Sequence, residues 1–378
     1  MKRAQQAQPH ITINDVAQVA AVSPTTVSNV LNGRTNAMSP ETWQRVQTAI
    51  RQLRYRPSHA ARGLVTHRSA TIGLIIAEIE TPLFLQALHH IEPIARTAGY
   101  NVLLCIARNL ADERQALDLL LEKQVEGIIF LSTSQSLDDN HLLELKNTGL
   151  PVVLVNRAMA HDCFDQINWD NSRGIGKAVD HLVELGHRDI ALLRGPDKRR
   201  SSGERLSGYR LALERHGIAF REEFVQPGDF TALADQWRQS TLNLLALNPR
   251  PTALIASDDV VAAIVMSTLE RAGLHIPNDL SVVGFDDQSI CTLLNPTLST
   301  VQLPIIEAGK LAGEMLLQRI AGERGNVQHI TLQCQLIRRD STGVCAQPAQ
   351  ARFTALAGAV QSTQVPKLES ANVNHPSL

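Results

Sequence analysis

The stretch TINDVAQVAAVSPTTVSNVLNG, residues 12–33, contains two helix starts and one helix end. Thr12 with Asp15 three residues later is a capping-box-like start, in which an acidic residue also suits the positive end of a helix. Ser23 followed by Pro24 is a typical N-cap with proline at the first helical position. Asn32-Gly33 is a typical helix end. The stretch therefore predicts two short helices joined by a tight turn.

A third helix is predicted just beyond this pair. Ser39-Pro40 repeats the start signal, and apolar residues follow at helical spacing at Trp43, Val46, Ile50 and Leu53. Two helices joined by a short turn, with a third to complete the core, is helix-turn-helix geometry. A three-helix bundle without any role in DNA binding has the same periodicity, so periodicity alone leaves both readings open.

The charge of the chain is unevenly distributed. The net charge is −1 overall, but residues 1–68 carry nine basic and two acidic side chains, a net charge of +7. The rest of the chain carries −8. A compact basic end on an acidic body is expected of a protein that contacts nucleic acid, although a solvated basic tail has the same composition. Residues 57–68 are short and alanine-rich, and a helix of that length is marginal unless something holds it.

From residue 71 the pattern changes to apolar runs separated by longer helical segments. The runs fall into two series, which predicts two similar lobes with buried parallel sheets covered by helices. We expect a further helix over 305–321 and a late strand over 329–337, so the chain should cross between the lobes more than once. The runs are 71–79, 101–107, 127–131 and 151–156, then 189–195, 252–259 and 281–287.

Composition excludes several classes of protein. Five cysteines lie far apart with no CxxC pair, which argues against a zinc ribbon, a redox dithiol or a disulfide scaffold and suits a reducing cytoplasm. The first ten residues lack the apolar run of a signal peptide, and no stretch reaches 18 apolar residues, so we expect neither export nor a membrane span. Walker A, GxSxG, HExxH and complete GxGxxG motifs are absent. We therefore expect no enzyme activity, no metal and no cofactor.

Five segments together resemble the lactose-repressor/galactose-repressor (LacI/GalR) family in order and spacing, over roughly residues 11–340. They are the headpiece sequence above with MSPETWQRVQTAIRQLRYRPS (38–58), PSHAARGL (57–64), INWDNSRGIGKAVDHLVELGHRDIALLRGP (167–196), IPNDLSVVGFDD (276–287) and NPTLSTVQLPIIEAGKLAGEMLLQRI (295–320). The resemblance implies a helix-turn-helix headpiece, a hinge helix and an α/β core of two Rossmann-like lobes resembling periplasmic sugar-binding proteins. It implies a transcriptional regulator, commonly a repressor, that binds palindromic operator DNA as a homodimer and responds to a small molecule, most often a carbohydrate.

This organisation gives expected domain boundaries. The headpiece should span 1–57, the hinge 58–68 and the two-lobed core 69–343. Within the core we expect an N-lobe of about 69–165 plus 302–326 and a C-lobe of about 166–301 plus 327–343. Residues 344–378 are rich in Ala, Gln, Ser and Pro and are expected to be disordered.

The DNA site is expected on the second helix, whose N-terminal residues enter the major groove in the helix-turn-helix mode. Asn29 can bond adenine and Thr25 can reach a base edge, unless both only cap or contact phosphates. Leu64 matches the family's hinge leucine, which implies a minor-groove wedge; packing against a dimer mate is the alternative. The full predicted set is Thr12, Ser23, Pro24, Thr25, Thr26, Ser28, Asn29, Asn32, Ser58, Arg62 and Leu64.

The effector site is expected where strand carboxyl ends meet, since small polar ligands bind there in open α/β sheets. Asp170, Asp258 and Asp286 occupy such ends, and Arg205 aligns with the family's effector-contacting arginine. An arginine with several carboxylates suits vicinal hydroxyls or a carboxylate; a salt-bridge network without ligand is the alternative. The resemblance adds two aromatic positions and two departures from the family pattern, namely Phe84, Phe230, Asn156 and Ser257.

Three other kinds of protein would show some of these sequence features. A solute-binding protein would have the same core, but it would have no headpiece and would carry a signal peptide, which this sequence lacks. An α/β enzyme would need a catalytic motif that the sequence lacks. A DNA binder that has lost effector response is favoured only by the altered segment around 257–263.

Overall fold

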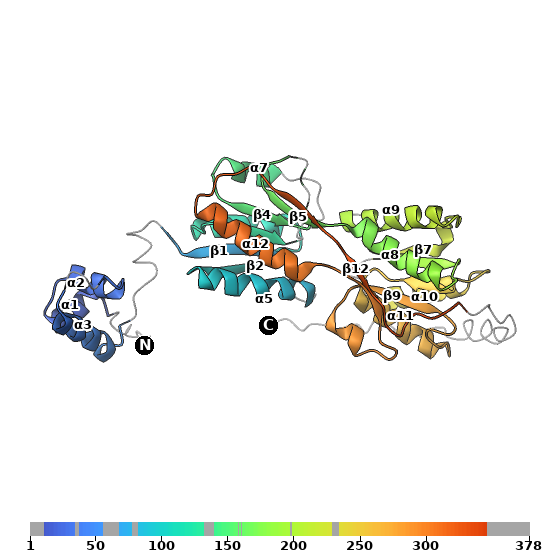
Figure 1. The fold of residues 1–378 in the computed structure, drawn as a ribbon, viewed down its shortest axis with the longest axis horizontal. Helices are drawn as coiled ribbons and strands as arrows, with labels where there is room; N and C mark the ends of the chain where they lie inside the picture. Colours follow the sequence, from blue (N-terminus) through green and yellow to red (C-terminus); the bar gives the residue numbers. More distant parts are fainter. Residues whose placement is uncertain are drawn as a thin grey trace, which may run out of the picture.

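The computed structural model describes residues 11–34, 38–55, 68–77, 82–131, 140–157, 159, 161–196, 199–228 and 234–345 (Figure 1). Its elements form a three-helix headpiece and two α/β lobes, each around its own parallel sheet. The described part of the chain confirms the predicted fold class.

The headpiece helices begin at the predicted caps. They are α1 (Ile13–Ala20), α2 (Pro24–Leu31) and α3 (Pro40–Gln52). Thr12 and Asp15 form the capping box, and Ser23 and Ser39 each accept a hydrogen bond from the backbone N–H three residues later. Ala21, at φ 50°, supplies the left-handed residue that ends α1 and turns the chain toward α2.

The headpiece core contains Val16, Val27 and Val46, which are fully buried. One predicted core residue is wrong, because Trp43 is 41% exposed and Ala49 is buried in α3 instead. At 100° per residue, Val46, Ala49 and Leu53 fall within an arc of about 60°, and Trp43 lies beyond its edge.

The first sheet, which defines the N-lobe, has the strand order β11-β5-β4-β3-β1-β2 with parallel pairing throughout. Its four inner strands are nearly all buried, as expected for a parallel sheet covered on both faces, whereas the edge strands β2 and β11 are mostly half-buried or exposed. In chain order they are β1 (Thr71–Ile76), β2 (Asn101–Ile106), β3 (Ile128–Leu131), β4 (Val152–Val155), β5 (Asp165–Trp169) and β11 (His329–Leu332). The N-lobe helices are α5 (Pro82–Thr97), α6 (Leu110–Glu122), α7 (Asn140–Lys146) and α12 (Ile305–Ile320), with α5 beside α12.

The second sheet, which defines the C-lobe, has the order β12-β10-β9-β8-β6-β7, and only β12 runs antiparallel to its neighbour. Its strands are β6 (Ile190–Arg194), β7 (Val225–Pro227), β8 (Ala253–Ile255), β9 (Ser281–Asp286), β10 (Ser299–Gln302) and β12 (Gln335–Ile337). The helices are α8 (Asn171–Glu184), α9 (Arg200–Arg215), α10 (Ala234–Leu245) and α11 (Asp259–Arg271), with short 3-10 turns η1 (Glu222–Phe224) and η2 (Ser289–Thr292).

The chain crosses between the lobes three times, after β5, after β10 and after β11. This confirms repeated crossing but corrects the lobe boundaries: residues 166–169 and 329–332 pair in the N-lobe sheet, not in the C-lobe. The predicted single strand over 329–337 is two strands in different sheets. The apolar pattern is the same on both sides of residues 333–334, so it does not reveal that the chain changes sheets there.

Candidate DNA-binding and effector-binding sites

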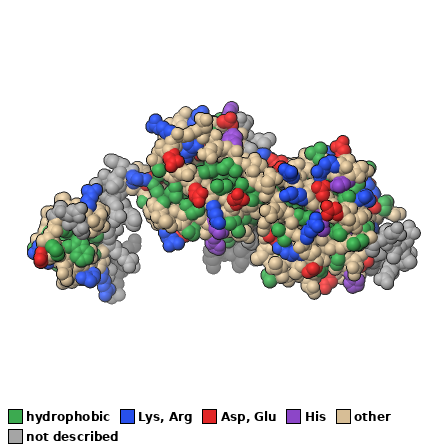
Figure 2. All heavy atoms as spheres, viewed as in Figure 1, with side chains coloured by type: hydrophobic (Ala, Val, Ile, Leu, Met, Phe, Trp, Pro, Cys, Tyr) green, Lys and Arg blue, Asp and Glu red, His purple; other side chains and the backbone are tan. Residues whose placement is uncertain are grey.

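Helix α2 presents a polar face beside its buried one. Val27 and Val30 point into the headpiece core, whereas Thr25 is exposed and Asn29 is half-buried. All the arginines in the described residues of the headpiece are exposed: Arg45 and Arg51 on α3, Arg54 just after α3 and Arg34 just after α2; Figure 2 shows basic side chains at the headpiece border. An exposed basic surface suits an anionic partner.

Several of the predicted DNA-binding residues already have local hydrogen bonds. The Thr12 amide and hydroxyl both donate to the Asp15 carboxylate, over 2.6 and 2.8 Å. The Ser23 hydroxyl accepts from the Thr26 amide at 3.1 Å and lies 3.0 Å from the Thr26 hydroxyl. The Asn32 side-chain amide donates weakly to Ser28 at 3.4 Å. Thr12, Ser23 and Thr26 therefore fix the helix starts, and Thr25 and Asn29 are the better candidates for reaching bases.

Four predicted site residues lie outside the described part of the chain. They are Ser58, Arg62, Leu64 and Phe230.

A second group of predicted residues surrounds Arg205 of α9, in the C-lobe. Its guanidinium lies 3.6 Å from the centre of the Phe285 ring and 3.8 Å from the Asp286 carboxylate. It also donates to the Ser257 carbonyl and, at 3.4 Å, to the Asn171 side chain. Only 14% of the Arg205 side chain and 9% of the Asp286 side chain are exposed. The structure thus brings together Arg205, Ser257 and Asp286 as predicted.

Arg205 and the carboxyl groups around it influence one another's pKa values. Burial lowers the pKa of Arg205, and Asp286 is the largest influence that opposes this, with Asp258 and Glu204 adding to it. Burial raises the pKa of Asp286 well above its ordinary value, although Arg205 lowers it. Burial also raises the pKa of Asp259 to about 6. Several carboxyl groups thus share one deeply placed cation.

Strained backbone marks two strand ends that carry predicted effector-site residues, one in each lobe. Asn156 follows β4 at φ 55°, and Asp286 and Asp287 end β9 at φ 110° and 56°. Residues other than glycine that are held in this region cost energy and gather at functional sites. Asp170 and Asp258 have a structural role at their strand ends, because each caps a helix by accepting a backbone N–H at 2.8 Å.

Among the described residues, the Ser257 hydroxyl and the Trp169 indole nitrogen are two of several buried polar atoms that lack a hydrogen-bond partner. Such atoms are rare in native proteins and are expected where a ligand or water completes the site. The Ser257 hydroxyl belongs to the residue whose carbonyl binds Arg205.

One aromatic side chain predicted at the effector site, Phe84, does not lie in the Arg205 cluster. Phe84 is 4% exposed and packs in the core of the N-lobe, as does Trp169. Sequence reasoning missed Phe285 and Asn171, which contact Arg205 directly. Both adjoin predicted residues, since Phe285 precedes Asp286 and Asn171 follows Asp170.

Within the described residues, no group of acidic, histidine or cysteine side chains is placed to hold a metal ion. None of the helices found there is both long and apolar enough to cross a membrane.

Comparisons with known proteins agree with this architecture. Residues 12–58 match the model for bacterial regulatory proteins of the lacI family, and residues 179–342 match the periplasmic binding protein-like domain. The HTH-type transcriptional repressor PurR of Proteus mirabilis is 34% identical over 334 residues, covering 87% of this chain and 96% of that protein. The chain belongs to the lacI family of bacterial regulatory proteins.

Other proteins that are similar to this lacI-family chain have different names and ligands. Catabolite control protein A of Priestia megaterium is 32% identical over 335 residues, covering 88% of this chain and 99% of that protein. A lac repressor dimer bound to operator and the anti-inducer ONPF superposes with a TM-score of 0.79 at 28% identity, covering 88% of this chain and 99% of that one. A CelR–cellobiose complex gives a TM-score of 0.66 at 29% identity, over 88% and 99% of the two chains. The lacI-family chain is therefore a DNA-binding transcriptional regulator with a ligand-binding regulatory domain.

Proposed function

We propose that this regulator is a repressor whose operator affinity is set by a neutral carbohydrate or a similar polyhydroxy compound bound at the Arg205 cluster, between the lobes. The observation that carries this proposal is the cluster itself: a nearly buried arginine stacked on Phe285 and faced by the Asp286 carboxylate. Arginine forks and carboxylates together bind vicinal hydroxyls, and Phe285, fully buried beneath the guanidinium, fixes the position of Arg205.

The charge of the site favours a neutral ligand over a phosphorylated one. Among the described residues, the carboxylates of Asp286, Asp258 and Glu204 all act on Arg205. A phosphate group would bring negative charge next to these buried carboxyl groups, whereas hydroxyl groups can both donate to and accept from them. The unpartnered Ser257 hydroxyl offers one more group to such a ligand.

On the DNA side, Thr25 and Asn29 would read bases, and Thr26 and Ser28 would lie near phosphates. Pro24 has no amide to donate, so it would position α2 rather than read sequence. The hinge residues Ser58, Arg62 and Leu64 would complete the contact, with Leu64 as the minor-groove wedge. Operators of helix-turn-helix dimers are palindromic, so a homodimer is part of this proposal. No enzymatic step is part of it.

The ligand acts by favouring one arrangement of the two lobes, which changes whether the hinge holds the headpieces on the operator. Induction and corepression differ only in which arrangement the ligand binds better, and both are compatible with this geometry.

The test is a thermal-melt screen of the full chain with ribose, cellobiose, glucose and the corresponding sugar phosphates. Wild type should melt at a higher temperature with at least one neutral sugar, and Arg205→Met should lose that shift. Arg210→Met is the matched control, because Arg210 lies on the same helix and also stacks on a phenylalanine, Phe220, at 4.2 Å. Retention of the full shift in Arg205→Met would reject the assignment, and a response to sugar phosphates alone would reject the neutral ligand class.

A further inference from the structure

Asp287 lies directly beside the proposed effector site but does not contact Arg205 in any interaction found among the described residues. It follows Asp286, the carboxylate that faces Arg205 at 3.8 Å. Both aspartates have positive φ, so the orientation of Asp286 depends on what holds the kinked backbone at Asp287.

The Asp287 carboxylate is held by two donors from distant parts of the chain. One oxygen accepts from the Arg339 guanidinium at 2.6 Å, and the other accepts from the Gln302 side-chain amide at 2.7 Å. The Asp287 and Arg339 side chains are only 13% and 18% exposed. Because the pair is largely shielded from water, its interaction is far less weakened by solvent than a surface ion pair.

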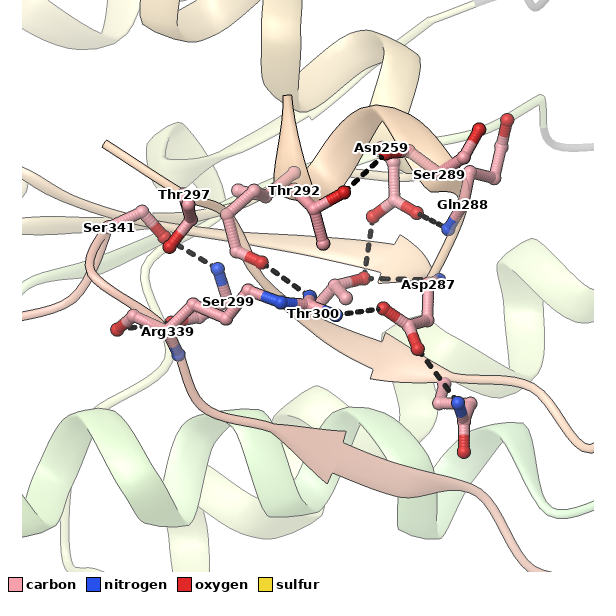
Figure 3. A network of polar contacts seen from close by, with 12 residues as sticks. Asp259, Asp287, Gln288, Ser289, Thr292, Thr297, Ser299, Thr300, Arg339 and Ser341 are labelled. Atoms are coloured by element: carbon pink, nitrogen blue, oxygen red, sulfur yellow. Dashed lines mark hydrogen bonds and ion pairs between the residues drawn. The ribbon is translucent and has the colours of Figure 1, made fainter. Parts of the chain in front are cut away.

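Arg339 is itself fixed on three sides (Figure 3). Its backbone N–H donates to the Ser299 hydroxyl at 2.8 Å, and that hydroxyl donates back to the Arg339 carbonyl at 3.1 Å. Its side chain also donates to the Leu298 carbonyl at 2.8 Å. Arg339 is thus a rigid support for Asp287.

The two donors to Asp287 lie close to the segments where the chain crosses between the lobes. Gln302 is the last residue of β10, immediately before the second crossing between the lobes. Arg339 lies two residues after β12, the strand that begins immediately after the third crossing. Asp287 therefore joins the end of β10, next to the second crossing, and the segment after β12, the first strand beyond the third crossing, to the strand that carries Asp286.

We propose that Asp287 and Arg339 act as a positioning pair that couples the relative arrangement of the two lobes to the orientation of Asp286 in the effector site. A change of lobe angle must twist the chain at the crossings, and Gln302 and Arg339 transmit that twist to the kink at Asp286 and Asp287. Conversely, a ligand that orients Asp286 favours one arrangement of the crossings. This inference rests on the proposed effector site.

The first test is hydrogen exchange of the full chain without ligand, comparing Arg339→Met with Arg338→Met. Arg338 is the neighbouring arginine, is 61% exposed and pairs with Glu184 at the surface, so it controls for the loss of a charge at this segment. We expect Arg339→Met to raise exchange about tenfold at Asp287, and also at Asp170, whose amide donates to the Leu332 carbonyl where the crossings meet. Faster exchange confined to residues 338–341, or equal in both variants, would overturn the coupling.

The second test uses the neutral sugar that gives the largest melt shift in wild type. Arg339→Met and Asp287→Asn should each weaken sugar binding about tenfold, and the double variant should be no weaker than the worse single one. Arg339→Lys, which keeps the charge, should recover part of the affinity, and Arg338→Met should bind as wild type does. Additive losses in the double variant would contradict a shared pair. A wild type that responds to no sugar would count against the proposed ligand only, since the exchange measurement decides the coupling by itself.

Discussion

Asp259 shows how strongly this fold controls a single carboxyl group. One oxygen accepts from the Thr300 hydroxyl at 2.5 Å and the other from the backbone N–H of Gln288 at 2.7 Å. Burial still dominates and raises the pKa of Asp259 from 3.8 to about 6. The folded chain therefore holds a proton here in a pH range in which the unfolded chain has released it.

This gives a pH dependence with a definite sign. The contribution of Asp259 to the free energy of unfolding is fully present below about pH 4 and is lost as pH rises through about 6. Asp259→Asn removes the titration, so its free energy of unfolding should fall less than that of wild type over this range, by roughly 3 kcal/mol at most. Denaturant titrations at pH 4, 5, 6 and 7 measure the difference. An unchanged slope in Asp259→Asn would refute the assignment.

For single residues, the sequence indicates which side chains are candidates for the effector site, but it does not indicate which side chains they contact. Strand ends and family resemblance predict Arg205, Asp258 and Asp286 as effector-site residues, and the structure places Arg205 and Asp286 side by side. Arg339 and Gln302 are not predicted, because each meets Asp287 only through a fold that brings residues 52 and 15 positions apart together. Nothing local in the sequence marks such a pair.

At the scale of elements, the two Ser-Pro starts make a natural pair for comparison. Ser23 caps α2 and Ser39 caps α3 with the same geometry, each bonded to the residue three positions on. Ser23→Ala and Ser39→Ala should each destabilise the headpiece by about 1 kcal/mol. Only Ser23→Ala should also reduce the preference for operator over random duplex, because α2 is the proposed reading helix. Equal loss of preference in both variants, measured by DNA titration, would argue against α2 in that role.

The turn between α1 and α2 allows a second prediction. Ala21 is held at φ 50°, where a side chain costs about 1 kcal/mol relative to glycine. Ala21→Gly should therefore slow hydrogen exchange over residues 11–34 and 38–55, whereas Ala49→Gly, in the interior of α3, should speed it by removing a buried methyl and a good helix former. Faster exchange in Ala21→Gly would show that the turn is not strained.

Elements whose signals are local were predicted well, and those defined by pairing were not. Thr12, Ser23 and Ser39 mark helix starts through bonds to residues three positions away, so their pattern can be read from the sequence. The division of 329–337 into β11 and β12 depends on which sheet each half joins, and that is decided by β5 and β10, far away in the chain. The lobe boundaries were misplaced for the same reason.

For the molecule as a whole, a homodimer requires an exposed surface on which two copies of the chain can pack. In the C-lobe, Leu293 is 80% exposed beside η2, and Val260 on the adjoining α11 is 48% exposed. In the N-lobe, Figure 2 shows hydrophobic side chains gathered over α5 and α12, where Ile306 is 45% exposed. Exposed apolar groups grouped in this way mark interaction surfaces, and a second copy of this chain would cover both lobes.

Leu293→Asp should therefore shift the chain toward monomer in sedimentation velocity at micromolar concentration, because a carboxylate would be buried at the interface. Leu211→Asp, at a 57% exposed leucine of α9, is the matched control and should sediment as wild type does. A wild-type monomer would contradict the homodimer, and dimers that survive Leu293→Asp intact would place the interface elsewhere.

The most direct measurement of the central claim is selection of bound duplexes from a random DNA library by the full chain, repeated with Asn29→Ala. Wild type should enrich one palindrome with half-sites about one helical turn apart, and Asn29→Ala should relax the preference at one position of each half-site. Enrichment of no sequence over random duplex, in the presence or absence of a sugar that shifts the thermal melt, would contradict the account.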